Sequence, residues 1–344
     1  MFKQIKNYLS CATLLVLALG CNTENTQNAT QFTPEITAKP INIKIQRLDQ
    51  DLFALSQNRI GVEQLGLKYG NVLDIVLQNI MGLPVAEPQT ALAQFFSNKY
   101  ISQLYSDTQK QFGDLKALEQ DFSAALSRYQ AIFPKQPVPR VTAMLTGFAQ
   151  ANALTDSGIL VGLDMFLGKN YRFYPTVQAI NTYQRHRLTP EYIVPNSVYL
   201  LAQDALANTR LKTNNLLENM VYQGKMLYIS KAILPNTPDS LLLGYTAAQT
   251  DWITKSEGSV WAYTIENELI YTTQQLVISK FMNDAPFTAG LPKQSPPRLG
   301  RYVGWQIVKN YMKKNPEITI PALINTDAQL ILNKSGYKPQ AGLK

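Results

Sequence analysis

The sequence predicts an α+β fold that is mostly α-helical, in which a small sheet packs on a helical body. Apolar and polar side chains alternate over residues 41–46, which is typical of a half-buried strand. Two short runs rich in apolar and β-branched residues, 141–148 and 159–163, suit neighbouring strands of one sheet. Apolar residues three or four positions apart, above all over 190–206 and 215–233, predict helices.

The segment between the first and second strands is predicted to be mainly helical. A helix begins at Arg47, with Asp49 as its N-cap. The apolar stripes that follow are typical of helices packed on a core. These further helices are predicted over 62–80, 90–105 and 115–133.

The middle of the chain carries the other two strands and the two longest helical patterns. A loop is predicted between the strands, marked by Asn152, Asp156 and Gly158. An aromatic loop follows at 171–175. Residues 189–191, Thr-Pro-Glu, have the types expected for the N-cap, first position and first-turn acid of the helix over 190–206.

Beyond residue 240 the predicted elements are helices separated by breaks. A Pro- and Gly-rich loop, 285–298, is long enough to form a lid or a contact surface, although loops of this kind commonly only connect. The predicted helices cover 247–258, 260–271, 272–282, 299–314 and 320–332.

The beginning of the chain predicts export. Two lysines precede a short apolar run in residues 1–20, which is typical of a signal peptide. The run ends in Ala-Leu-Gly before Cys21, which resembles the lipobox of bacterial lipoproteins, in which the Cys is acylated. Acyl chains on Cys21, palmitate among them, would anchor the protein to a membrane. The alternative is an ordinary signal peptide cut near Ala18, which leaves a free thiol.

The charge and cysteine content narrow the function classes. Without the signal peptide the chain has 30 basic and 24 acidic residues, and no run of Lys or Arg exceeds two, so no nucleic-acid partner is predicted. Cys11 leaves with the signal and Cys21 is modified, so the mature chain has no thiol for a disulfide, a nucleophile or a metal. No later stretch approaches 18 uninterrupted apolar residues.

Three parts of the chain are predicted. Residues 1–20 are the signal peptide, and 21–40 are the lipidated Cys with a polar tether. Residues 41–340 form a single large globular domain with a mainly helical lobe, 41–139, and a second lobe, 140–340. We expect this body in the cell envelope, on the periplasmic side of its membrane anchor.

The mature chain lacks a complete catalytic set. His186 is its one histidine, which argues against catalytic zinc and against a Ser-His-Asp triad, and the phosphate-binding glycine motifs are absent. We therefore predict no catalytic residues, metal or cofactor. Carboxylates and arginines remain. Asp164, at the end of an apolar strand, is either a buried functional acid or, as is more common, the cap of a turn. Glu266 and Glu268 lie two apart on a helix, so they point to different faces and make no obvious acid/base pair. Arg298 and Arg301 stand at a helix start, where the alternatives are a grip on an anion and the more common solvated or structurally paired role.

Three blocks carry a family resemblance: 45–53 (IQRLDQDLF), 158–168 (GILVGLDMFLG) and 300–311 (GRYVGWQIVKNY). With the lipobox at Cys21, they resemble the GldB-type gliding-motility lipoproteins over nearly the whole mature chain. The resemblance implies an envelope lipoprotein of the gliding apparatus and its associated secretion system. Its expected partners are other envelope proteins of that machinery, and no catalytic activity is implied.

A second resemblance is to zinc peptidases of the gluzincin type. The order of strand, two helices and a closing G-x-x-x-G-W helix is similar, but the first helix, 190–202, lacks the HExxH histidines. Gln223 stands where the second helix would carry its acidic ligand. The resemblance implies a zincin-like fold that has lost its metal site, in which Gly224 serves close helix packing.

Two hypotheses follow for the function. The first is a non-catalytic component that contacts partner proteins. It predicts an exposed apolar or aromatic patch, with 285–298 as a candidate part of it, and a neutral helix cleft at Asn196, Gln203 and Gln223. The second is a periplasmic hydrolase or glycan-binding module. It would need two facing carboxylates and a cleft lined by aromatic side chains such as Tyr171, Phe173 and Tyr174.

Overall fold

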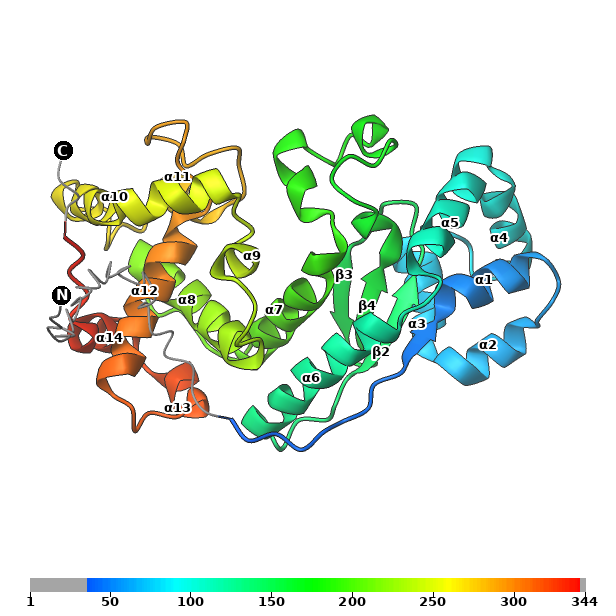
Figure 1. Cartoon of the computed structure of the whole chain (residues 1–344), viewed down its shortest axis with the longest axis horizontal. Helices are drawn as coiled ribbons and strands as arrows, with labels where there is room; N and C mark the ends of the chain where they lie inside the picture. The colour runs from blue at the N-terminus through cyan, green and yellow to red at the C-terminus, as the bar shows by residue number, and fades with distance from the viewer. Residues whose placement is uncertain (1–35, 341–344) are drawn as a thin grey trace, which may run out of the picture. The chain divides into compact units, whose positions relative to one another are not determined.

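A four-stranded mixed sheet joins the beginning of the folded chain to its middle (Figure 1). In this computed structural model, which describes residues 36–340, β1, β2 and β4 run parallel and β3 is antiparallel to β4. The two predicted apolar strands are neighbours, as expected, and β3 forms where a loop was predicted. The strands, in the spatial order β1-β2-β4-β3, are β1 (Ile45–Arg47), β2 (Arg140–Met144), β4 (Gly158–Gly162) and β3 (Asn152–Thr155).

The predicted strand over 41–46 is mostly not a strand. The Ile41 N–H donates to the Ser127 hydroxyl and the Ile43 N–H to the Ser123 hydroxyl, both at 2.9 Å. These hydroxyls lie on α6 (Lys116–Ile132), so the segment runs along this helix and joins the sheet only from Ile45. The alternation of apolar and polar residues therefore reflects packing against a helix.

Local caps and glycines divide the N-terminal helices more often than predicted. Gly70, at φ +56°, ends the first part of the 62–80 pattern. The Asn98 side chain accepts the N–H groups of Tyr100 and Ile101, so it begins a new helix inside the predicted 90–105. The helices are α1 (Leu48–Ser56), α2 (Val62–Tyr69), α3 (Asn71–Asp74), a π-helical turn (Ile75–Ile80), α4 (Pro88–Ser97) and α5 (Lys99–Phe112).

The predicted helices of the second half form with different breaks. The patterns over 247–258 and 260–271 merge into one helix that ends at Glu266, whereas Asp327 caps a separate helix within 320–332. The helices are α7 (Ile193–Ala205), α8 (Leu216–Ile233), α9 (Asp239–Leu243), α10 (Ala247–Glu266), α11 (Gln275–Met282), α12 (Leu299–Lys314), α13 (Ile320–Asn325) and α14 (Ala328–Ser335).

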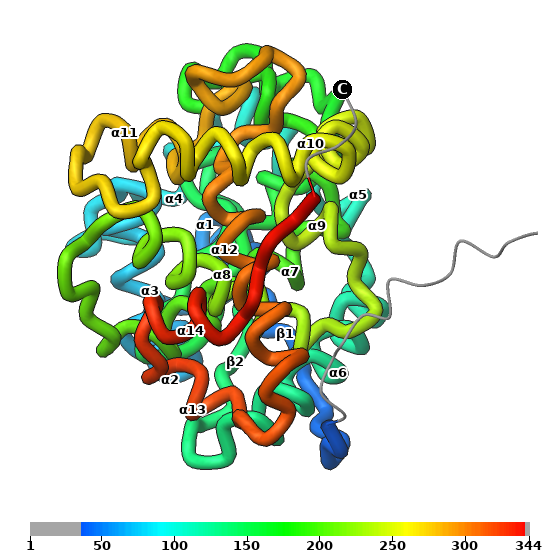
Figure 2. Tube along the Cα trace, turned by 90° about the vertical axis from the view of Figure 1, so that its left-hand side faces the viewer, coloured from blue at the N-terminus to red at the C-terminus, as the bar shows by residue number. Residues whose placement is uncertain are grey.

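Helices α8 and α12 cross in the core with their backbones in contact (Figure 2). A Cβ on Gly224 would overlap the carbonyl of Gly304, and one on Gly304 would overlap the carbonyl of Met220. Only glycine fits so close an approach. The predicted packing role of Gly224 is confirmed, and the crossing fixes the start of α12 relative to α8.

The signal peptide, Cys21 and nearly all of the tether predicted over 21–40 lie outside the described residues. Residues 36–340 belong to one unit of the chain, Thr33–Lys344. Within the described part of the chain, no helix combines the length and apolarity needed to span a bilayer.

Candidate functional site

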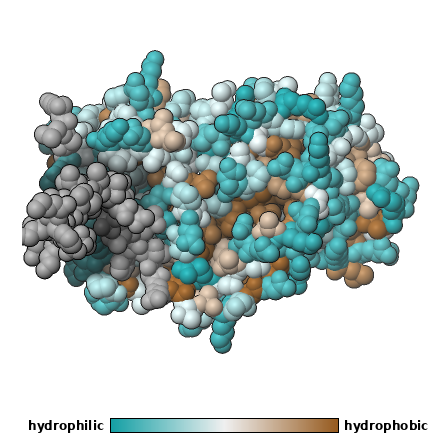
Figure 3. Space-filling model, in the orientation of Figure 1, coloured by the Kyte–Doolittle hydropathy of each residue, from teal (hydrophilic) through white to brown (hydrophobic). Residues whose placement is uncertain are grey.

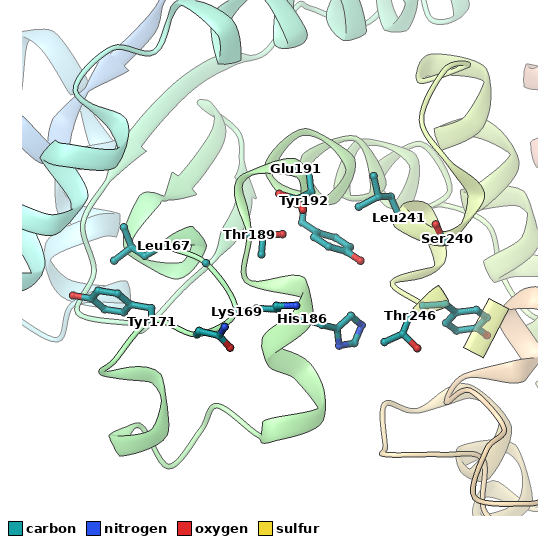
Figure 4. A pocket seen from close by; sticks show the side chains of 13 residues that line it. Leu167, Lys169, Tyr171, His186, Thr189, Glu191, Tyr192, Ser240, Leu241 and Thr246 are labelled. Carbon is teal, nitrogen blue, oxygen red and sulfur yellow. The ribbon is translucent and has the colours of Figure 1, made fainter. Parts of the chain in front are cut away.

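A cleft of about 770 Å³ opens between the segment after β4 and the segment after α9 (Figure 4). One wall is formed by 167–171 and the opposite wall by 240–246. Its floor comes from the segment that leads into α7. Figure 4 shows His186 and Thr246 close together from opposite sides, with the Tyr192 ring between the walls.

The start of the α7 helical stretch lies at this cleft. Pro190–Tyr192 is a 3-10 turn that continues into α7, and Thr189 has the extended backbone of an N-cap. The prediction for Thr189 is half right, because its hydroxyl makes no capping hydrogen bond. The Thr189 Oγ1 atom is buried without a partner, and Glu191 on the first turn also lines the cleft.

His186 and Arg298 satisfy the last carbonyl groups of α9. The His186 Nε2 atom lies 3.0 Å from the Gly244 carbonyl oxygen, and Arg298 Nη2 donates to the Leu243 carbonyl at 2.9 Å. Gly244 adopts φ +67°, and a Cβ there would lie 2.8 Å from the Arg187 side chain. The single histidine is therefore engaged with a helix end.

Arg187, Arg298, Arg301 and Asp284 form a group that we call the arginine junction. Arg187 Nη2 donates to Asp284 Oδ2 at 2.5 Å, and Gln184 Nε2 donates to the same oxygen at 3.0 Å. Arg298 Nε lies 3.6 Å from Asp284 Oδ1. The junction ties the segment before α7 to the end of α11 and the start of α12.

The charges of the junction shift one another's pKa values. Burial, together with the like charges of Arg301 and Arg187, lowers the pKa of Arg298 to about 10. Burial alone would raise the pKa of Asp284, but the charge of Arg298 and the hydrogen bonds from Arg187 and Gln184 lower it. Two of the three guanidinium groups, those of Arg187 and Arg298, thus share the carboxylate of Asp284.

Gln223, at the position that the peptidase resemblance gives to an acidic ligand, forms a neutral pair. The Tyr199 hydroxyl on α7 donates to Gln223 Oε1 on α8. The guanidinium of Arg301 lies 5.1 Å from the centre of the Tyr199 ring. A tyrosine, an amide and an arginine therefore meet where α7, α8 and α12 come together.

Asp164 is a fully buried acid that organises a turn. Its carboxylate accepts the N–H groups of Thr146 at 3.1 Å and Phe148 at 2.6 Å, just after β2. Burial raises the pKa of Asp164 to about 6, although these N–H donors favour its charged form. Asp164 therefore has the turn-capping role that such residues commonly have.

Asp49, the predicted N-cap of the first helix, is instead buried in the first turn of α1. It accepts two hydrogen bonds from Arg47, at 2.9 and 2.7 Å, and one from Gln109 at 2.8 Å. Its carboxylate therefore ties α1 to α5. Glu266 and Glu268 are exposed at the end of α10 and beyond it, away from the cleft residues.

The predicted aromatic cleft does not form as a unit. Tyr171 lines the cleft, but Tyr174 is fully buried and its hydroxyl donates to the Asp164 carbonyl oxygen. Phe173 packs edge to face against Tyr100 and Tyr171. One of the three rings is therefore available to a ligand in the cleft.

A second cleft of about 760 Å³ lies between β3, the end of α6 and α7. Gln203 lines this cleft together with Leu154, Leu200 and Tyr222. Contrary to the prediction, Gln203 and Gln223 therefore do not line one polar cleft, and Asn196 is partly buried on α7. Figure 3 shows apolar side chains gathered near the middle of this face, where Figure 1 draws β3, β4 and α7. Two exposed acids, Asp156 and Asp204, also line this cleft.

The loop 285–298 is closed by hydrogen bonds within itself. The Thr288 hydroxyl donates to the Pro296 carbonyl at 2.8 Å, and both residues are buried. None of the described large apolar side chains that are strongly exposed belongs to this loop, so its expected part in an apolar patch is wrong. Such side chains occur where α10 leads to α11: Ile265 is 45%, Tyr271 54% and Leu276 74% exposed.

Sequence reasoning found Arg298 and Arg301 but missed Asp284, Arg187 and Tyr199. The sequence does show a carboxylate just after a helix, Asp284, and a basic run at 185–187. Only the fold shows that the two are in contact, because they are 97 residues apart in the chain. Among residues 36–340 there is no group of three His, Cys, Asp or Glu side chains placed to hold a metal ion.

Comparison with protein families identifies the family of this chain. The family model described as gliding motility protein GldB matches residues 29–339, which include the sheet, both clefts and the arginine junction. No curated protein and no solved structure matches the chain. Because the family model covers nearly the whole sequence, the chain belongs to the GldB family of gliding-motility lipoproteins, which are proteins of the cell envelope.

Proposed function

We propose that this protein works without catalysis, as a lipid-anchored component of the gliding and associated secretion machinery that binds other envelope proteins. The surroundings of its reactive groups support this role. His186 contacts a helix-end carbonyl, Asp164 accepts backbone N–H groups, and Gln223 pairs with Tyr199. Each of these groups is committed to holding the fold together.

The observation that carries the proposal is an exposed apolar surface, the α10–α11 corner, formed by Ile265, Tyr271 and Leu276. Ile265 and Tyr271 line a hollow of about 500 Å³ with Leu332 of α14, and Leu276 follows in the first turn of α11. Figure 2 shows α10, α11 and α14 on one side of the molecule. Clustered apolar side chains at a surface are typical of protein contacts.

The test is site-specific photo-cross-linking in native envelopes. A photoreactive residue at Leu276 should capture a reproducible set of envelope proteins. The matched control is Leu67 on α2, which is 91% exposed outside the α10–α11 corner and should capture little. Equal capture from both positions would remove the support for a docking surface.

A hydrolase is the second candidate, because Asp156 and Asp204 line one cleft. A glycosidase needs two carboxylates at a suitable separation. Purified protein would be incubated with peptidoglycan fragments, and product would be compared with the Asp156→Asn/Asp204→Asn double variant. Turnover that the double variant abolishes would establish the enzyme and overturn the non-catalytic role.

A further inference from the structure

The arginine junction holds more positive charge than its own carboxylate balances. Arg187 and Arg298 share Asp284, while Arg301 lies against the Tyr199 ring. The negative charge of Asp284 raises the pKa of Arg298, but burial and the two neighbouring arginines outweigh it. A buried cation without full compensation carries a desolvation cost that a further anion would offset.

Several polar atoms of the junction have no hydrogen-bond partner. They are Nε of Arg298, Nε of Arg301 and Oδ1 of Asp284, all buried. Arg298 is 8% exposed, and its backbone has φ +56°, a strained conformation for a residue other than glycine. The fold therefore holds this guanidinium in place without satisfying it fully.

The junction adjoins the first cleft. Arg187 follows the cleft residue His186 in sequence, and the Tyr245 hydroxyl, whose ring lines the cleft, donates to the Arg298 carbonyl. The side chains of Asp284 and Arg187 are 27% and 18% exposed, so solvent reaches the group. The hydroxyl of Thr189, which also lines the cleft, has no hydrogen-bond partner.

We propose that the arginine junction and the cleft beside it bind a carboxylate carried by a partner protein. Asp284 already shows that a carboxylate fits between Arg187 and Arg298. Tyr192, Tyr245 and Leu241 supply the apolar and aromatic wall that a peptide requires. The inference rests on the proposed binding role and assigns it a ligand chemistry.

The test measures binding of a fluorescent four-glutamate peptide to the full-length protein by anisotropy, with a four-glutamine peptide as the neutral comparison. The glutamate peptide is expected to bind at least about tenfold more tightly. Arg298→Gln should weaken its binding by about tenfold or more. Arg128→Gln removes one positive charge from another partly buried site, where Arg128 donates to the Ala232 carbonyl, and should leave binding unchanged.

A second variant keeps the test decisive if Arg298→Gln does not fold. Asp284→Asn removes the internal carboxylate that competes for the arginines, so it should strengthen binding several-fold. Equal binding of the two peptides, equal losses in both arginine variants, or weaker binding by Asp284→Asn would overturn the inference. Displacement of the peptide by millimolar phosphate but not by millimolar acetate would also overturn it. Cross-linking from Leu276 reports the docking surface independently of these results.

Discussion

Asp164 and Asp284 are both carboxylates that tie a loop to the body, yet their surroundings are opposite. Asp164 is fully buried and is held by backbone N–H groups, with its pKa raised. Asp284 is partly exposed and is held by guanidinium groups, with its pKa lowered. The turn held by Asp164 needs no ligand to complete its hydrogen bonds. The arginine junction, in contrast, carries more positive charge than the carboxylate of Asp284 neutralises. The difference separates a structural region from the proposed binding region.

The arginine junction depends on the position of α12, because Arg298 and Arg301 stand at the start of this helix. Gly304→Val would force α12 away from the Met220 carbonyl and should lower the free energy of unfolding by more than about 3 kcal/mol. Urea denaturation measures this change. Gly66→Ala, in open space on α2, is the control and should stabilise by up to about 1 kcal/mol. Similar effects at both sites would contradict the tight crossing.

Asp164 should make the protein less stable as pH rises. Its folded pKa of about 6 exceeds its unfolded pKa, so the contribution is full below about pH 4 and is lost as pH passes 6. The loss should reach at most about 3 kcal/mol. Denaturation at pH 4 and pH 7, for the wild type and Asp164→Asn, isolates this change. An unchanged pH slope in the variant would show that Asp164 does not titrate in this range.

Asp284 should show the opposite pH dependence. Its lowered folded pKa means that its contribution is present above the unfolded pKa of about 4 and is lost as pH falls through the folded value. At pH 7, Asp284→Asn should cost about 1 to 2 kcal/mol, less than for a fully buried pair, because the carboxylate is partly exposed. The exposed pair partner Asp251 provides the control, and Asp251→Asn should change stability by less than about 0.5 kcal/mol.

The Tyr199 hydroxyl gives the smallest expected effect. Tyr199→Phe leaves Gln223 without its donor beside Arg301 and should cost about 1 kcal/mol of unfolding free energy. Tyr100→Phe, at a side chain that is 62% exposed, should be neutral. A neutral Tyr199→Phe would mean that water replaces the tyrosine, and that the site beside Arg301 is open to solvent.

Much of the fold was predictable because long apolar periodicity dominates it. The predicted 215–233 and 299–314 agree closely with α8 and α12. The breaks were missed where one residue outweighs the pattern: Asn98 caps α5 inside an apolar stripe, and Gly70 adopts a left-handed φ. The four-residue β3 depends on pairing with β4, and so its own sequence favours it weakly.

The candidate site was only partly predictable. Arg298 and Arg301 are close in sequence, so an anion-binding pair was a reasonable interpretation. Arg187 and Asp284 meet only because 182–187 packs against the end of α11, and no local pattern specifies that contact. The zincin likeness stays a prediction, because no solved structure matches the chain.

The path of residues 36–45 along α6 determines how mechanical tension enters the body. A pull on the chain before Ile36 reaches α6 first, through the Arg128 side chain on the Ile36 carbonyl and then the Ser127 hydroxyl on the Ile41 N–H. These contacts lie in series ahead of β1, which adjoins β2 at the edge of the sheet. A force applied there would therefore break the hydrogen bonds between this segment and α6 one at a time, before it acted on the pairing of β1 with β2.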